Sequence, residues 1–445
     1  MQQDSPHTQQ LSFLAPNLID QLNPKHPLLQ LAKRIPWNYF ETEFSPLYAH
    51  TGRPAKPIQL MVGLCILKHL ENLSDERVVQ LWVQNPYYQL FCGEVEFQWK
   101  LPCDPTDLIY FRQRIGTEGI EKIFAASIVI HGDNAREAEV CIDTTVQEKA
   151  ITFPTDAKLY RKIIVHCLKI VRANSIQLRR TYAKEIKQRK LECRFAGHPK
   201  NLAKARKAVK RLKTIAGRLV RDIERKLPAD ILQASQERFT QFHRALQQNR
   251  GHKQKIYSLH EPHVYCMSKG KEHKKYEFGT KVSITATRDS KIIVGAMAFD
   301  SNQYDGHTLP EVLLQLKRLM NYEPVAALCD RGYKGKSKIN NTQILRPNSK
   351  TKDADQKTQT LMRERFRKRA GIEPVIGHLK SDHRLNRNFL KGFAGDRMNV
   401  LLAAAAFNFK KWMRLFLFAC YLWRLKRAFE NFIEAHAKPA PLLLV

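Results

Sequence analysis

Three acidic residues that lie far apart along the chain could together hold a metal ion. Asp143 lies in the β-branched run AEVCIDTTV (138–146), and Asp330 ends the apolar run PVAALCD (324–330). Both are predicted to sit at the ends of β-strands, where loops are free to approach a ligand. Two carboxylates that meet at such a place repel each other, and a divalent ion is the usual relief. Either Asp taken alone is weak evidence, because an Asp that closes a strand is more often a turn residue.

The third acid, Glu373, is the only one in FRKRAGIEPVIGHLK (366–380). On an uninterrupted helix, Arg369, Glu373 and Lys380 would lie within about 60° of one another. Such a face suits phosphodiester chemistry, in which carboxylates hold metal and cations hold phosphates. A row of surface ion pairs, worth about 0–1 kcal/mol each, would look the same. Pro374 favours either a kink or a helix that restarts there and divides the face.

The chain carries a large positive charge, part of which is concentrated in one region. It contains 75 Lys and Arg against 42 Asp and Glu, a net charge of +33. Between residues 158 and 226, 23 basic residues stand against four acids. Apolar residues in this region follow helical spacing and predict a helix with one buried seam. These residues are Leu202, Ala205, Val209, Leu212, Ala216, Leu219 and Ile223. A solvated helix face is one explanation of the charge, but mutual repulsion favours a DNA-contacting insertion.

Strands and helices are predicted on both sides of this basic region. They are strands at 275–287 and 291–299, a helix at 307–319, a strand at 342–347 and a basic helix from about residue 357. The first two of these strands are predicted to pair as a hairpin. With the strands that carry Asp143 and Asp330, this order resembles the ribonuclease H plan. In that plan the first and fourth strands are neighbours, which would bring the two aspartates together.

The region before Asp143 is predicted to be helical. Apolar residues at 56–71 have helical spacing, Ser74 has the position of an N-cap, and a third helix is expected near Pro105. Further along, Asp305 is predicted to be a helix N-cap. A second possibility is that Asp305 and His307 touch metal or DNA near the site.

The nine cysteines contain no C-x-x-C pair, which favours a reducing cytoplasm. The amino-terminal segment MQQDSPHTQQLSF lacks the basic and apolar parts of an export leader. The apolar stretch LFLFACYLW (415–423) is far shorter than the ~20 residues of a membrane span. It is predicted to be a packing helix, with an interfacial helix as the alternative, and no membrane partner is expected.

Four motifs, in order, resemble those of bacterial insertion-sequence transposases of the DDE type. Phe366, Arg369, Glu373 and Lys380 have the spacing of the Y-(2)-R-(3)-E-(6)-K signature, with Phe in place of Tyr. The segments IDTTVQEK (142–149) and CDRGYKG (329–335) are similar to those around the family's first and second Asp. The helical start TGRPAKPIQLMVGLCILKHLENLSDE is similar to the InsH-like amino-terminal domain of the insertion-sequence-five group.

This resemblance implies a recombinase with Asp143, Asp330 and Glu373 as its catalytic and metal-binding triad. The cofactor would be Mg²⁺ or Mn²⁺, as two ions, and no nucleotide-binding motif is present. The DNA contacts that the matching motifs imply are Arg369, Lys380, Arg331 and Lys334. The partners would be transposon ends and target DNA, bound by a homodimer or larger assembly at the bacterial nucleoid.

The expected fold is an α/β ribonuclease H-like core, a mixed sheet flanked by helices, with an all-α amino-terminal domain and a basic helical insertion. The predicted boundaries are 1–135 for the amino-terminal domain, 136–155 for the first strand segment, 156–258 for the insertion, 259–400 for the rest of the core and 401–445 for a helical tail. The predicted function is DNA cleavage and strand transfer by 3′-OH attack. Two alternatives are a non-catalytic repressor of transposition and a metal-dependent nuclease of the same fold.

Overall fold

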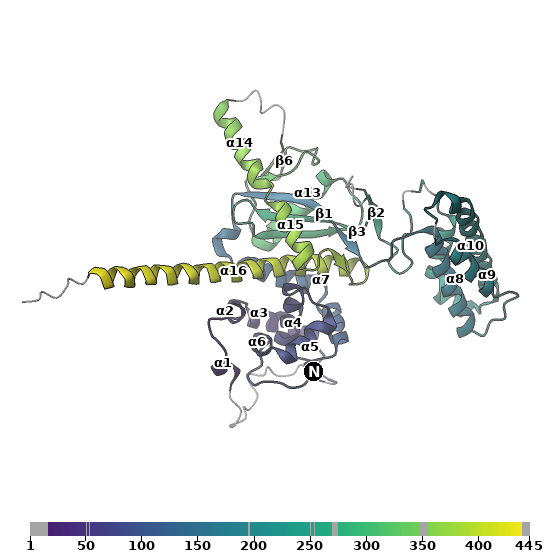
Figure 1. Cartoon of the computed structure of the whole chain (residues 1–445), viewed down its shortest axis with the longest axis horizontal. Helices are drawn as coiled ribbons and strands as arrows, with labels where there is room; N and C mark the ends of the chain where they lie inside the picture. The colour runs from purple at the N-terminus through teal and green to yellow at the C-terminus, as the bar shows by residue number, and fades with distance from the viewer. Residues whose placement is uncertain are drawn as a thin grey trace, which may run out of the picture.

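The computed structural model describes residues 17–437, apart from positions 50, 53, 195, 250, 253, 269–274 and 348–354. The segment on which the expectation of no export leader rests lies outside these described residues. Figure 1 shows a mixed β-sheet above a group of helices, with the long helix α16 between them and a separate group of helices to one side. The sheet positions two of the three predicted acids, Asp143 and Asp330.

The sheet contains eight strands. They are β1 (Glu139–Lys149), β2 (Tyr265–Met267), β3 (Glu277–Thr287), β4 (Ile293–Phe299), β5 (Ala326–Leu328), β6 (Lys338–Ile339), β7 (Thr342–Leu345) and β8 (Arg387–Asn388). Their order is β2-β3-β1-β5-β7-β6, with β4 paired to β3 and β8 paired to β1. β1 runs antiparallel to β3 and parallel to β5. The predicted hairpin and the predicted contact between the first and fourth strands are therefore confirmed.

The central strand β1 is buried because neighbouring strands and helices cover it. Val140, Cys141 and Ile142 are at most 1% exposed, as expected of a strand in the middle of a mixed sheet. Near its end β1 lies very close to β3 at Gly279. A Cβ atom at Gly279 would be only 1.9 Å from the carbonyl oxygen of Gln147. Glycine is therefore required for this approach of two backbones.

The amino-terminal region is helical, as predicted. Its α-helices are α1 (Leu18–Gln21), α2 (Pro27–Ala32), α3 (Trp37–Phe44), α4 (Ile58–Leu70), α5 (Asp75–Gln84), α6 (Pro86–Phe91) and α7 (Pro105–Val129). The Ser74 side chain accepts a hydrogen bond from the Arg77 N–H at the start of α5, so the predicted N-cap is confirmed. One hydrophobic cluster continues from these helices through α16 into the sheet. The domain boundaries stay a prediction.

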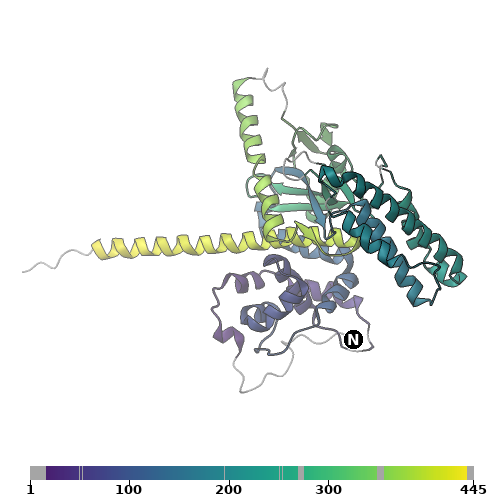
Figure 2. The ribbon, with the colours of Figure 1, turned by 45° about the vertical axis from the view of Figure 1, so that its right-hand side comes forward.

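A second group of helices, here called the helical unit, lies between β1 and β2 in the chain. It comprises α8 (Asp156–Ala173), α9 (Ala183–Glu192), α10 (Pro199–Lys226), α11 (Ala229–Ala234) and α12 (Gln236–Gln247). Figure 2 shows these helices packed side by side. They enclose a hydrophobic cluster of their own. Five seam residues of α10 are buried: Ala205, Leu212, Ala216, Leu219 and Ile223. The predicted seam is thus confirmed, except that Leu202 at its start is 39% exposed.

The carboxyl-terminal part carries four more helices. They are α13 (Asp305–Met320), α14 (Gln356–Arg369), α15 (Ile372–Asp382) and α16 (Gly392–Ala437). α13 packs on β3 and β4, while α16 contacts β4, α4 and α7. Beyond the sheet, α16 extends away from the rest of the protein (Figure 1).

The stretch 415–423 is helical, but the prediction that it packs within the chain is wrong. Phe418 and Tyr421 are each 58% exposed, because α16 has already passed the sheet and the amino-terminal helices at this point. Among the described residues, no helix is long and apolar enough to cross a membrane.

Candidate active site

Asp143 lies in the middle of β1, so the expectation that it sits near the end of its strand is wrong. The reason is that β1 continues its antiparallel ladder with β3 as far as Glu148. Its parallel ladder with β5, however, stops at the pair Cys141 and Leu328. Asp143 thus comes immediately after the end of the parallel pairing, where the neighbouring strand turns away.

Asp330 lies two residues past Leu328, the last residue of β5, so the strand ends slightly earlier than predicted. Asp143 and Asp330 are each two residues past the last pair of this parallel ladder, Cys141 and Leu328. Residues two apart along a strand point to the same face. The Oδ1 atom of Asp330 accepts a hydrogen bond from the Gly332 N–H (2.8 Å), which fixes the start of the loop.

Glu373 lies on a separate helix from Arg369, so the predicted continuous face does not exist. α14 ends at Arg369 and α15 begins at Ile372, which places Pro374 in the first turn of a new helix. The alternative prediction of a helix that restarts is therefore correct, although the new helix begins at Ile372 and not at Pro374. A side chain from another element binds the end of α14. Lys291, in the hairpin of β3 and β4, donates a hydrogen bond from Nζ to the Lys368 carbonyl (2.5 Å).

Arg369 connects two of the three acids. Its Nη2 atom is 3.2 Å from Asp143 Oδ2, and its Nη1 atom is 3.7 Å from Glu373 Oε1. The Arg369 side chain is only 12% exposed, against 69% for Glu373. Arg369 therefore faces the carboxylates rather than the solvent, which differs from its expected role as a DNA contact.

A fourth acid lies beside this cluster. Asp305 Oδ1 accepts hydrogen bonds from the Thr144 hydroxyl and from Lys281 Nζ, each at 2.9 Å. The N-cap of α13 is Tyr304, so the prediction that Asp305 caps this helix is wrong. Because Asp305 already has these two donors, it braces the residue next to Asp143. The exposed His307 packs its ring against the Tyr304 ring.

The floor of the cluster is dry and uncharged. Cys329 and Tyr333 are at most 1% exposed. Burial raises the pKa of the Cys329 thiol and of the Tyr333 hydroxyl above their ordinary values. Both groups therefore stay neutral near pH 7, and neither competes with the aspartates for a cation.

A cation already lies against these acids in the form of the Arg369 guanidinium. Among the described residues, no three Asp, Glu, His or Cys side chains stand close enough together to bind one metal ion. The donor chemistry nevertheless fits a hard divalent cation, because all the candidate groups are carboxylate oxygens. Movement of Arg369 would free Asp143 and Glu373 for that role.

The remaining predicted contacts are spread around the cluster. Arg331 and Lys334 are exposed on the loop after Asp330, and neither forms an ion pair with a described residue. Lys380 lies two turns beyond Glu373 on α15 and is partly buried.

Sequence reasoning missed Lys281 and Tyr333. The partner of Lys281 comes from another element, and nothing local in its strand marks it. Tyr333 lies within the motif CDRGYKG. The small and polar residues around it give no sign that its ring is buried. Thr144 could have been found, since it directly follows Asp143.

Comparison with known proteins adds a second line of evidence. Residues 16–114 match a family described as a transposase domain, DUF772, and residues 248–409 match one described as a transposase DDE domain. A Rhizobium meliloti protein described as uncharacterized protein ORF8 in the nfe locus is 41% identical over 182 residues. The match covers 40% of this chain and 88% of that protein. No solved structure matches the chain.

Proposed function

The chain belongs to the DDE-type transposases, and from that premise we propose that it cuts DNA at the ends of its own mobile element and joins the freed 3′-OH to target DNA. Each transfer exchanges one phosphodiester for another, so the reaction needs no nucleotide. The observation that supports this proposal is the contact of Arg369 with both Asp143 and Glu373, next to the parallel pairing of β1 and β5, two residues beyond which lie Asp143 and Asp330.

Enzymes of this family depend on a divalent metal. We propose that Asp143, Asp330 and Glu373 hold two Mg²⁺ or Mn²⁺ ions, as in two-metal catalysis. When bound, such ions activate the attacking oxygen and stabilise the leaving oxygen. Arg369 then turns from the carboxylates to a DNA phosphate, for which its planar guanidinium is well shaped.

Other residues of the chain orient the reacting groups. Lys281 and Thr144 fix Asp305 and so hold the strand beside Asp143 in place. The buried Tyr333 keeps water away from the floor of the site. Arg331 and Lys334, on the exposed loop, are proposed to hold the DNA backbone as it enters.

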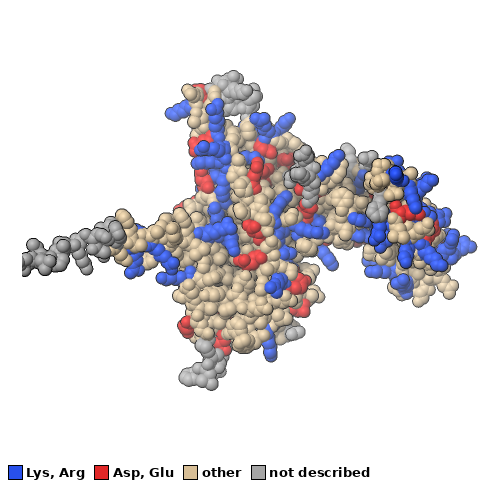
Figure 3. Space-filling model, viewed as in Figure 1, with Lys and Arg blue, Asp and Glu red and all other residues tan. Residues whose placement is uncertain are grey.

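The path of the DNA is proposed from the distribution of charge. Figure 3 shows Lys and Arg side chains along α14 and over the helical unit. We propose that the helical unit is an insertion in a ribonuclease H-like core, that it contacts DNA, and that the protein acts as a homodimer or larger assembly on paired ends at the nucleoid. We also propose that the protein belongs to the insertion-sequence-five group.

A strand-transfer assay tests the function. Purified protein is mixed with Mg²⁺, a duplex that carries the inverted repeats flanking the gene, and a target plasmid. Asp143→Ala, Asp330→Ala and Glu373→Ala are each expected to abolish cleavage and joining while binding of the duplex is kept. The matched control is Asp300→Ala, which removes an exposed acid outside the site.

The outcomes separate the proposed function from its alternatives. Cutting without joining would indicate a nuclease, and binding without cutting would indicate a repressor. Cleavage by the Glu373→Ala protein at the parental rate would sink the triad assignment.

A further inference from the structure

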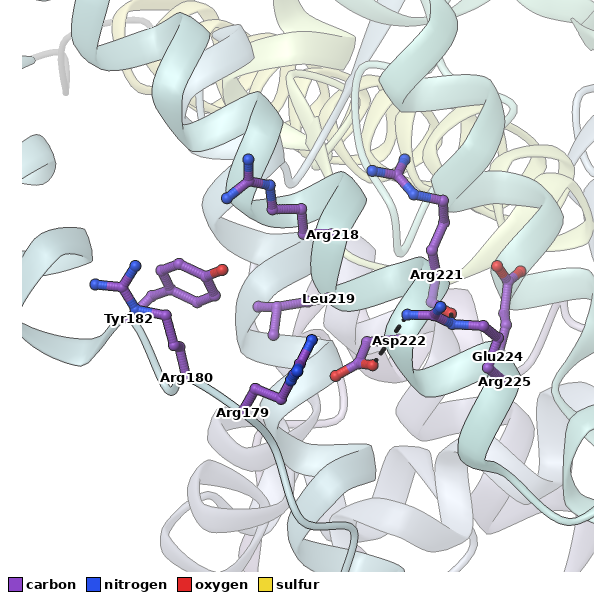
Figure 4. Close-up of a pocket in the computed structure, with 9 residues that line it drawn as sticks. All are labelled: Arg179, Arg180, Tyr182, Arg218, Leu219, Arg221, Asp222, Glu224 and Arg225. Carbon is purple, nitrogen blue, oxygen red and sulfur yellow. Dashed lines mark hydrogen bonds and ion pairs between the residues drawn. The ribbon is translucent and has the colours of Figure 1, made fainter.

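The helical unit contains a hollow whose basic lining residues are all arginine. It has a volume of about 520 Å³ and lies between the loop that joins α8 to α9 and one face of α10. Its basic lining residues are Arg179, Arg180, Arg218, Arg221 and Arg225, with no lysine among them. Figure 4 shows these side chains around the hollow. The absence of lysine is informative, because residues 158–226 contain both types of cation in similar numbers.

The spacing of the α10 arginines explains why they share one face. Arg218, Arg221 and Arg225 follow one another at steps of three and four residues, so they lie above one another on the helix. Leu219 is buried beneath them and joins the core of the helical unit. A rigid helix thus presents the guanidinium groups.

The opposite wall is held in place by the fold. Lys226 Nζ donates a hydrogen bond to the Gln177 carbonyl (2.6 Å) and ties the loop to the end of α10. Tyr182 packs against the same core in a left-handed conformation, with φ at 54°. The Arg180 guanidinium lies 5.6 Å from the centre of the Tyr182 ring. The loop that carries Arg179 and Arg180 is therefore held against α10 before any ligand arrives.

The acids of the hollow already have partners. Asp222 is 3.2 Å from Arg225 and 3.6 Å from Lys226, and Glu224 forms a 2.7 Å contact with His243. By contrast, four arginines form no ion pair of 4 Å or less with any described residue. They are Arg179, Arg180, Arg218 and Arg221.

We propose that this arginine hollow is a binding site for phosphates of a DNA backbone, separate from the predicted active site. Four unpaired guanidinium groups around one space repel each other, and an anion relieves that repulsion. Arginine binds phosphate through two parallel N–H groups, whereas lysine offers a single point charge. This inference rests on the proposed function, because it assumes that the polyanion is DNA. In this proposal the helical unit holds the DNA at a position where no bond is cut or formed.

The test is the salt dependence of binding by the full-length protein. The variant Arg218→Gln/Arg221→Gln removes two charges from the hollow. The control variant Arg206→Gln/Lys210→Gln removes two charges from exposed positions on the same helix outside the hollow. The probe is a 30-base-pair duplex of mixed sequence, used without metal so that nothing is cut. Polyglutamate of similar charge serves as the second probe.

The hollow variant is expected to bind the duplex with a salt slope shallower by about 2, since each phosphate contact contributes about 0.9. Between about 50 and 200 mM salt, two such contacts account for a roughly tenfold change in affinity. The control variant should keep the parental slope. Arg218→Lys/Arg221→Lys, which keeps the charge, should keep most of the slope but bind less tightly, because the paired N–H geometry is lost.

Three results would overturn the inference. One is a parental slope in the Gln variant while its thermal melting is unchanged. Another is an equal loss in the control variant, which would indicate a diffuse field. The third is a loss of polyglutamate binding with no loss of duplex binding, which would indicate an acidic protein partner. If the parental protein joins DNA strands while the hollow variant keeps its slope, the proposed function stands and only this site fails.

Discussion

Replacing Lys149 with Met is expected to destabilise the strand that carries Asp143. Lys149 is the last residue of β1, and its side chain is only 2% exposed. Its Nζ atom is 2.7 Å from Asp396 Oδ1 and 3.5 Å from Glu261 Oε2. Methionine has a similar volume, so the substitution mainly removes the charge. Two buried carboxylates would then face each other without their shared cation.

The magnitude follows from the burial of this group of charges. Removing one partner of a buried ion pair costs about 3–5 kcal/mol. Asp396→Asn should cost less, about 1.5–3 kcal/mol for weakened charge-assisted hydrogen bonds, because Lys149 keeps Glu261 as a partner. Burial acts to raise the pKa of Asp396, but hydrogen bonds from His263 and Lys149 hold it below its ordinary value. Asp396 is thus charged at neutral pH and needs compensation.

Thermal unfolding measures this difference. At about 2–4 °C per kcal/mol for a unit of 150–250 residues, Lys149→Met should lower the Tm by roughly 6–20 °C. Strand transfer should survive at 20 °C and fail at 37 °C, because the fold rather than the chemistry is impaired. A Tm for Lys149→Met within 2 °C of the parent would refute the reasoning. So would a larger loss for Asp396→Asn than for Lys149→Met.

Two further predictions concern Arg369 and Asp75. Arg369→Gln should raise the affinity of the free protein for Mn²⁺ about tenfold, as measured by calorimetry. The reason is that a guanidinium about 6 Å from a dication opposes its binding by about 1.4 kcal/mol at a dielectric constant of about 80. An unchanged affinity would show that Arg369 does not compete with metal. Asp75 has its pKa lowered to about 2, since hydrogen bonds from Arg112 and the charge of Lys68 outweigh its burial. Its contribution of about 2 kcal/mol to the free energy of unfolding should be present above pH 4 and disappear between pH 4 and 2. Asp75→Asn should therefore flatten the dependence of the unfolding free energy on pH in that range. An unchanged pH dependence would contradict the pairing.

Much of the fold could be predicted from local sequence. The hairpin of β3 and β4, the seam of α10 and the N-cap at Ser74 depend on side-chain spacing within one element. The order of strands then made β1 and β5 neighbours, as the structure confirms.

Other features depend on contacts between distant segments. The sequence could not fix where β1 ends, because its length is set by the ladder with β3 rather than by a local turn. It left open whether α14 continues past Arg369, where Lys291 of the β3–β4 hairpin donates a hydrogen bond to the Lys368 carbonyl. The exposure of Phe418 follows from the direction in which α16 leaves the sheet.

By itself, the sequence determined the kind of element on which each of the three acids lies, since strand and helix patterns are written in neighbouring residues. Only the tertiary structure decided that Arg369 lies between Asp143 and Glu373. The reason is physical: a buried guanidinium needs compensating carboxylates, and the contact with Asp143 depends on how α14 packs against β1, which neighbouring residues do not specify.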